Sequence, residues 1–149
     1  MSLQWTETLR GSYFLVDSPD NVRPCEVRIH IVLHRPRGLE RQIDAQMTGD
    51  CTFDGLSEQA PIDGLLRVQI ARPRRVSYSF EFKDKNAEAL RFQGAKHPSL
   101  LRPLYSATTL WGSLFRGDRA IAMVALHFDL RRDLVAFVQS VIREADAAG

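Results

Sequence analysis

The sequence has only two cysteines, Cys25 and Cys51, among its 149 residues. Two thiols are too few for the disulfide framework of a small secreted domain or for a structural zinc site. No apolar run approaches the roughly 20 residues that a membrane-spanning helix needs. The N-terminus also lacks a basic stretch followed by an apolar run, because Thr6, Glu7 and Thr8 interrupt it. We therefore expect a cytoplasmic protein with neither a signal peptide nor a membrane span.

An excess of one charge is also missing, since 20 Lys and Arg face 18 Asp and Glu and the formal net charge is +2. The densest basic cluster, Arg72, Arg74 and Arg75 around Pro73, is more typical of a solvated turn than of a phosphate-binding patch. Nucleic acid is therefore not an expected partner. With 44% hydrophobic and 26% charged residues, the composition is that of one globular domain covering residues 1–149.

A helical period is missing from most of the chain, which instead alternates apolar and polar residues with a period of 2. This alternation predicts strands over residues 3–15, 25–34, 42–53, 60–70, 76–82, 90–97, 105–116 and 119–128. Consecutive antiparallel strands with short connections leave exposed edges unless the sheet closes. We therefore predict an eight-stranded antiparallel up-and-down barrel, lipocalin-like in outline, over about residues 3–128. Glycines fit its sharply bent strands at positions 11, 49, 64, 94 and 112.

Two hairpins have a predicted register. A turn centred on Gly38 pairs Cys25 with Cys51 and predicts two neighbouring buried thiols, with a disulfide as the less favoured alternative. A turn centred near residue 86 places Phe80 opposite Phe92, Tyr78 opposite Gly94, and Lys96 opposite Val76.

The last predicted strand pair is joined at Gly117-Asp118, a two-residue hairpin signal. It pairs His127 with Thr108, and both of its faces are apolar. One face contains Trp111, Phe115, Val124 and Leu126, and the other contains Leu110, Leu114, Ile121 and Met123. Which face points into the barrel stays open.

Beyond the strands the period changes to 3.6. Asp129 is a plausible N-cap, and a single stripe on one side of the predicted helix is apolar: Leu130, Leu134, Phe137, Val138, Val141 and Ile142. We expect a C-terminal helix over about residues 130–146, packed outside the last two strands.

Two opposite charges fall on inward positions. Glu7 shares its face of the first strand with Trp5 and Leu9, and Lys96 is on the inward face of the sixth strand. Because an unpaired buried charge is very unfavourable, we predict a Glu7–Lys96 ion pair inside the barrel. The pair could simply fix strand register, or it could anchor the polar head of a ligand.

The inner face of strands five and six also forms an aromatic wall of Tyr78, Phe80, Phe82 and Phe92. Such a wall suits either core packing or a pocket for sterols and acyl chains. The candidate ligand-binding residues are therefore Glu7, Lys96, Tyr78, Phe80, Phe92 and Trp111.

No metal site and no catalytic group is predicted. His30 and His34 are roughly 13 Å apart along a strand, at about 3.3 Å per residue, which is too far to chelate one metal. His97 points outward, and Ser106 and Thr109 lack the context of an activated nucleophile.

Four segments resemble the accessory β-domain of cholesterol-oxidase-like flavoproteins in the glucose–methanol–choline oxidoreductase family. They are WTETLRG (residues 5–11), YSFEFKDKNAEALRFQGAKH (78–97), ATTLWGSLFRGD (107–118) and DLVAFVQSV (133–141). The chain departs from that pattern at Leu9 and Trp111, where methionine and tyrosine are expected.

The resemblance implies a companion module, standing alone or fused to an oxidoreductase. No cofactor is expected, because the chain has no G-x-G-x-x-G after a strand and no parallel βαβ pattern. The leading hypothesis is a non-catalytic module that binds a lipophilic small molecule or docks on an oxidoreductase. The alternative is a small barrel enzyme, an isomerase or lyase using Glu7 or Lys96 as its base. A self-associating structural domain would instead expose an apolar patch on an uncovered face of the sheet.

Overall fold

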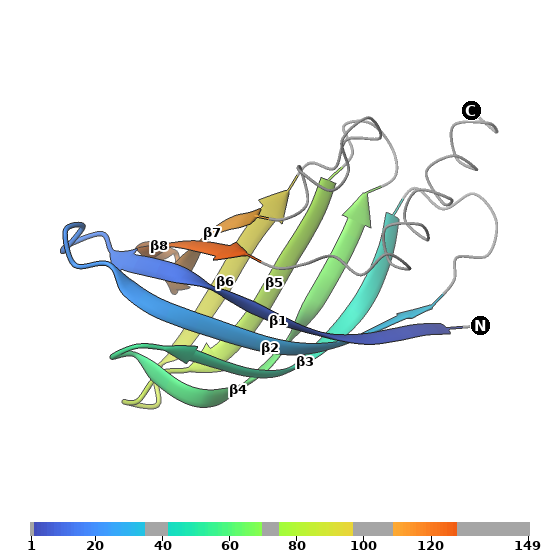
Figure 1. Cartoon of the computed structure of the whole chain (residues 1–149), viewed down its shortest axis with the longest axis horizontal. Coiled ribbons are helices and arrows are strands. Elements are labelled where there is room, and N and C mark those ends of the chain that lie inside the picture. Colours follow the sequence, from blue (N-terminus) through green and yellow to red (C-terminus); the bar gives the residue numbers. More distant parts are fainter. Residues whose placement is uncertain (1, 35–41, 70–74, 97–108, 128–149) are drawn as a thin grey trace.

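The computed structural model describes residues 2–34, 42–69, 75–96 and 109–127, which form one closed antiparallel barrel (Figure 1). The predicted eight-stranded barrel is confirmed. Its strands are β1 (Ser2–Leu15), β2 (Arg23–His34), β3 (Gln42–Phe53), β4 (Ser57–Gln69), β5 (Arg75–Lys83), β6 (Ala89–Lys96), β7 (Thr109–Arg116) and β8 (Arg119–His127).

Each strand pairs with the next one along the chain, and β1 pairs with β8 to close the sheet. The closing contact runs from Arg10, opposite His127, to Leu15, opposite Ala122. Closure gives these strands a hydrogen-bonding neighbour on both sides and so removes the exposed edges of an open sheet.

One end of the barrel, here called the turn end, contains the connections at residues 16–22, 54–56, 84–88 and 117–118. Asp84 organises one of them, because its buried carboxylate accepts hydrogen bonds from the backbone N–H of Asn86 (2.8 Å) and of Glu88 (3.0 Å). It also lies 3.4 Å from a guanidinium nitrogen of Arg116, which ties this turn to β7. Gly117 has a φ of 61°, as the two-residue turn between β7 and β8 requires.

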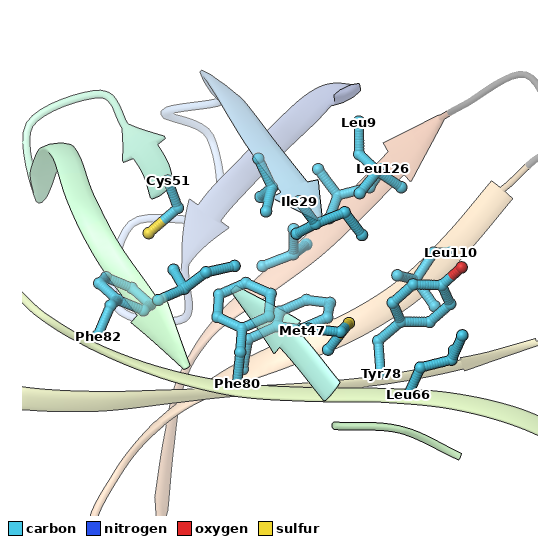
Figure 2. Packing of buried hydrophobic residues seen from close by; sticks show 14 of the residues in the cluster. Leu9, Ile29, Met47, Cys51, Leu66, Tyr78, Phe80, Phe82, Leu110 and Leu126 are labelled. Atoms are coloured by element: carbon cyan, nitrogen blue, oxygen red, sulfur yellow. The ribbon is translucent and has the colours of Figure 1, made fainter. Parts of the chain in front are cut away.

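The interior near the turn end is a connected set of rings, here called the aromatic cluster. Ring centroids are 5.3 Å apart for Tyr13 and Phe53, 5.4 Å for Phe53 and Phe82, and 4.8 Å for Phe80 and Phe92. Figure 2 shows Phe80 and Phe82 projecting from β5 into the same core as Met47 and Leu126. Aromatic side chains bury large areas, so this cluster is a main source of the barrel's stability.

The register predicted for β5 and β6 is confirmed, with Phe80 opposite Phe92, Tyr78 opposite Gly94 and Val76 opposite Lys96. The ring that covers the glycine is Phe92 rather than Tyr78. A Cβ added at Gly94 would lie 2.8 Å from Phe92 Cζ, and one at the neighbouring Gly112 would lie 2.7 Å from the same ring.

The register predicted for β2 and β3 is wrong by two residues. Cys25 lies opposite Phe53, and Cys51 lies opposite Val27, so the two cysteines do not face each other. Both are buried free thiols. A shift of two residues keeps every side chain on its own face, which is why the alternation of the sequence could not reveal it.

The faces predicted for the last two strands are also wrong. The register of β7 and β8 shifts between Leu114 and Phe115, where β8 contributes one extra residue, Ile121. This bulge exchanges the two faces of β8 relative to β7. Four of the predicted residues from the two strands are consequently buried together: Leu110, Leu114, Val124 and Leu126.

The bulge also sets the partner of His127, which is Thr109 rather than Thr108. The Thr109 hydroxyl lies 3.2 Å from His127 Nδ1. The predicted C-terminal helix over residues 130–146 lies outside the described residues. Within the part of the chain that is described, no helix has the length and hydrophobicity needed to cross a membrane.

Candidate functional site

β1 carries a buried carboxyl group that points into the barrel interior. Glu7 is only 6% exposed, although its neighbours on the same face of the strand are apolar. The alternation of β1 places Trp5, Glu7 and Leu9 inward and leaves Thr6 and Thr8 exposed. The prediction that Glu7 points into the barrel is confirmed.

The nearest polar group from the same strand is the indole of Trp5. Its Nε1 donates a hydrogen bond of 2.8 Å to Glu7 Oε1, and both side chains are buried. Residues two apart on a strand lie on one face, so β1 alone positions this pair. A hydrogen bond to a charged acceptor is stronger than a neutral one, and the bond fixes the direction of the carboxylate.

The phenol of Tyr78 on β5 lies within reach of the electrostatic effect of Glu7. The side chain is buried, and burial raises its pKa well above the usual value, with the negative charge of Glu7 as the second cause. Tyr78 is therefore neutral under ordinary conditions and keeps its proton for donation. We call Trp5, Glu7 and Tyr78 the Glu7 cluster; Figure 2 shows Tyr78 beside Leu66 and Leu110.

The structure brings together four of the predicted ligand-binding residues. Glu7, Tyr78, Phe80 and Phe92 all lie in the buried interior, and the Phe80 and Phe92 rings are stacked at an interplanar angle of 22°. Lys96 ends β6 opposite Val76, as predicted, but its side chain lies outside the described part. The Glu7–Lys96 ion pair stays a prediction.

Trp111 does not join the other candidates. Its side chain is 67% exposed on the outer face of the barrel, while its neighbours Leu110 and Gly112 are on inward positions of β7. The pairing of β7 with β6 is the physical reason, because Gly112 lies opposite the inward Gly94 and Trp111 lies opposite Ala95. Trp111 therefore belongs to a different surface from the Glu7 cluster.

That surface is an outer hollow of about 730 Å³ lined by residues of β3 to β8. Small and polar side chains line its floor, among them Ser77, Ser79, Ala95 and Ser113. The large apolar side chains among those that line it include Leu65, Trp111, Phe115 and Met123, and the long polar ones are Gln42, Arg67, Gln69, Arg75 and Gln93. Sequence analysis missed this hollow, because it depends on the bulge and on the curvature of the closed sheet.

Sequence analysis also missed Ser57, a buried hydroxyl near the turn end. Ser57 Oγ accepts a hydrogen bond of 3.1 Å from the Phe53 amide and donates one of 3.3 Å to the Cys51 carbonyl. These bonds satisfy the backbone where the register of β3 and β4 shifts. Ser57 is therefore a structural group and not an activated nucleophile.

The thiols are not candidates for chemistry. Burial raises the pKa of Cys25 to about 12, and it does the same for Cys51, whose pKa is also about 12. The thiolate is the reactive form, so neither cysteine is a nucleophile at neutral pH. Among the described residues, no group of three His, Cys, Asp or Glu side chains could hold a metal ion.

The Glu7 cluster offers a fixed carboxylate, an indole N–H and a neutral phenol in an apolar interior. Such a set can recognise the polar end of an otherwise apolar molecule, or it can provide a base beside a hydrogen-bond donor. Comparisons with protein-family models, with curated proteins and with solved structures found no match to this chain. The likeness to the accessory domain of glucose–methanol–choline flavoproteins is therefore still a prediction from the residues.

Proposed function

We propose that this protein is a non-catalytic β-barrel binding module whose interior takes a lipophilic small molecule with one polar group. The observation that carries the proposal is the buried Glu7 carboxylate, held by Trp5 at 2.8 Å inside a core that is otherwise almost entirely apolar. A carboxylate in such a core is held by compensating polar groups, and a polar group of this kind is what fixes the orientation of a ligand in an otherwise apolar site.

The chemistry of the cluster indicates the class of ligand. The apolar wall of Tyr78, Phe80 and Phe92 suits a ring system or an acyl chain, and eight strands enclose room for one small guest at most. The carboxylate of Glu7 would accept a hydrogen bond from a ligand hydroxyl. A sterol or a long-chain alcohol therefore fits the cluster better than a fatty acid, whose carboxylate would meet the charge of Glu7.

The fluorescence of Trp5 offers a direct test, because the chain has only two tryptophans and Trp111 is exposed outside the barrel. In a Trp111→Phe variant, titration with cholesterol or hexadecanol should change Trp5 emission in a saturable way. Palmitate should bind at least tenfold more weakly. A second variant, Trp111→Phe with Glu7→Gln, should reduce the preference for alcohol over acid.

No saturable change with any of the three probes, in protein that keeps its far-ultraviolet circular dichroism, would contradict the proposal. Native mass spectrometry of protein purified from its own host provides an independent reading, since a bound lipid adds its own mass to the barrel.

We propose further that the partner of the module is a flavin oxidoreductase of the glucose–methanol–choline type, encoded beside this chain or fused to it. The four segments with the likeness support the proposal. Affinity purification of the tagged chain from its own host tests the proposal. If no gene beside this one encodes such a flavoprotein, that result would count against it.

The second candidate function is an isomerase or lyase, and one observation favours it. The Glu7 carboxylate lies 2.8 Å from the indole N–H of Trp5, and a base with a nearby hydrogen-bond donor is the pair that abstracts a proton next to a carbonyl. Exchange of the α-protons of a steroid ketone in deuterated water, followed by NMR, would reveal this activity. It should vanish in Glu7→Gln and fall in Tyr78→Phe.

We also propose that residues 130–146 form an amphipathic helix outside the barrel. The proposal is supported by the change of hydrophobic period from 2 to 3.6 after β8 and by Asp129 as an N-cap.

A further inference from the structure

The outer hollow is bordered by large apolar side chains that the barrel itself does not cover. Leu65 is 43% exposed, Met123 is 44% exposed and Trp111 is 67% exposed. Single exposed apolar residues are ordinary, but these three line one hollow of about 730 Å³, with Leu65 on β4 at one side and Trp111 and Met123 on β7 and β8 at the other. Apolar residues gathered in this way mark a surface that another element covers.

Short side chains on β5, β6 and β7 line part of the hollow. Ser77 lies opposite Ala95 across β5 and β6, and Ser113 lies opposite Gln93 across β6 and β7. Most of these side chains are short, so a packed helix could approach the sheet closely between Leu65 on one side and Trp111 on the other. Close approach maximises the van der Waals contact on which such packing depends.

The chain itself supplies a fitting element. β8 ends at His127, beside Thr109 at the start of β7, and residues 128–149 follow it directly. Trp111 and Met123 lie on these same two strands, so a short connection reaches the hollow. A helix over residues 130–146 would be roughly 25 Å long at about 1.5 Å per residue, enough to cross several strands about 4.8 Å apart.

The pattern of this segment also matches the surface. Its apolar residues, such as Leu134, Phe137 and Val141, share one stripe, while Gln139 and Arg143 are on the opposite side. An amphipathic segment that stays free beside the exposed Leu65, Trp111 and Met123 leaves two sets of apolar side chains in water, and docking removes both from water. A second copy of the chain would cover the hollow without explaining the stripe.

We propose that residues 130–146 of this chain dock along the outer hollow as an amphipathic helix, with the apolar stripe against Leu65, Trp111 and Met123. The proposal concerns the outside of the barrel and is independent of any guest inside it.

Disulfide trapping in the full chain tests this placement, since Cys25 and Cys51 are buried and do not interfere. The variant Met123→Cys with Phe137→Cys should form an intrachain disulfide under mild oxidation at least tenfold faster than a control. The control is Thr48→Cys with Phe137→Cys, because Thr48 is exposed on β3 and does not line the hollow.

A second pair, Leu65→Cys with Val141→Cys, keeps the test valid if the first variant folds poorly. Trapping of both pairs within one chain supports the proposal. Disulfides that form only between chains would assign the hollow to a second copy and overturn the proposal, as would trapping no faster than in the control.

Discussion

The interior near the turn end consists of aromatic rings in contact, whereas the interior around Glu7 contains a carboxylate, an indole N–H and a phenol. In the aromatic cluster, Phe92 is fully buried and is stacked 4.8 Å from Phe80. In the Glu7 cluster, the shortest described contact is the 2.8 Å hydrogen bond from Trp5. The first arrangement stabilises the barrel through buried area. The second depends on polar groups that compensate one another, as in sites that recognise a ligand.

The aromatic cluster should be sensitive to the truncation of a single ring. Phe92→Ala removes a fully buried ring that also covers Gly94 and Gly112, so the free energy of unfolding should fall by about 3–5 kcal/mol. Urea denaturation followed by circular dichroism measures the loss.

Phe115→Ala is the matched control, because Phe115 is a partly exposed ring on β7 that contacts the Arg91 guanidinium at 5.1 Å. Its removal should reduce the free energy of unfolding by about 1 kcal/mol or less. Equal losses in the two variants would mean that the aromatic cluster is not the centre of stability.

The Glu7 cluster should show energetic coupling between Glu7 and Lys96. If Lys96 is the partner of Glu7, Lys96→Met alone should lower the free energy of unfolding by about 3–5 kcal/mol, because Glu7 loses its compensating charge. Adding Glu7→Gln should restore much of that loss. A double variant that equals the sum of the two single variants in urea denaturation would show that the residues are not partners.

The hydrogen bond within β1 should contribute less. Trp5→Phe keeps an aromatic ring but removes the donor to Glu7 Oε1, so the free energy of unfolding should fall by about 1.5–3 kcal/mol. The loss should shrink sharply in a Glu7→Gln background, where the acceptor has no charge. An unchanged loss in that background would indicate that packing of the indole, and not its N–H, stabilises the strand.

A further loss of stability is expected in alkali. The thiols of Cys25 and Cys51 have an ordinary pKa of 9.0 in the unfolded chain, and burial raises it to about 12 in the folded barrel. The unfolded state therefore releases these protons first as the pH rises above 9. The free energy of unfolding should fall between pH 9 and 12 by at most about 1.4 kcal/mol per pH unit for each thiol.

Denaturation with urea at several pH values from 8 to 11 measures this slope. Cys25→Ala with Cys51→Ala should flatten it, and Tyr78, whose pKa is raised from 10.0, should account for a further decline at higher pH. A slope that is unchanged in the double variant would assign the alkaline loss to other groups.

The inward position of Glu7 and the register of β5 and β6 could be predicted from the sequence. The alternation of Trp5, Glu7 and Leu9 correctly placed the carboxylate inside, because the side chains of a strand must alternate. The register of β5 and β6 was predicted as well, since a short turn fixes which residues face each other. The hydrogen bond from Trp5 to Glu7 follows from the same alternation but was not predicted.

Two features needed the tertiary structure. The pairing of Cys25 with Phe53 differs from the predicted pairing by two residues, a shift that changes no side chain's face and so leaves no trace in the pattern. The extra residue in β8, Ile121, puts Val124 and Leu126 on the same face as Leu110 and Leu114, whereas the sequence pattern predicted that they share a face with Trp111. A bulge adds one residue to one strand, and an apolar sequence on both faces does not reveal where that residue lies.

The sequence by itself determined the number of strands, their order and the inward position of Glu7, because these depend on local alternation and on the need to close a sheet with short connections. Only the tertiary structure decided which face of β7 and β8 is buried, and hence that Trp111 and Met123 border an outer hollow. That decision comes from closing the barrel, which aligns β8 with both β7 and β1 at once. The alternation within one strand does not determine how β8 pairs with two neighbouring strands at the same time.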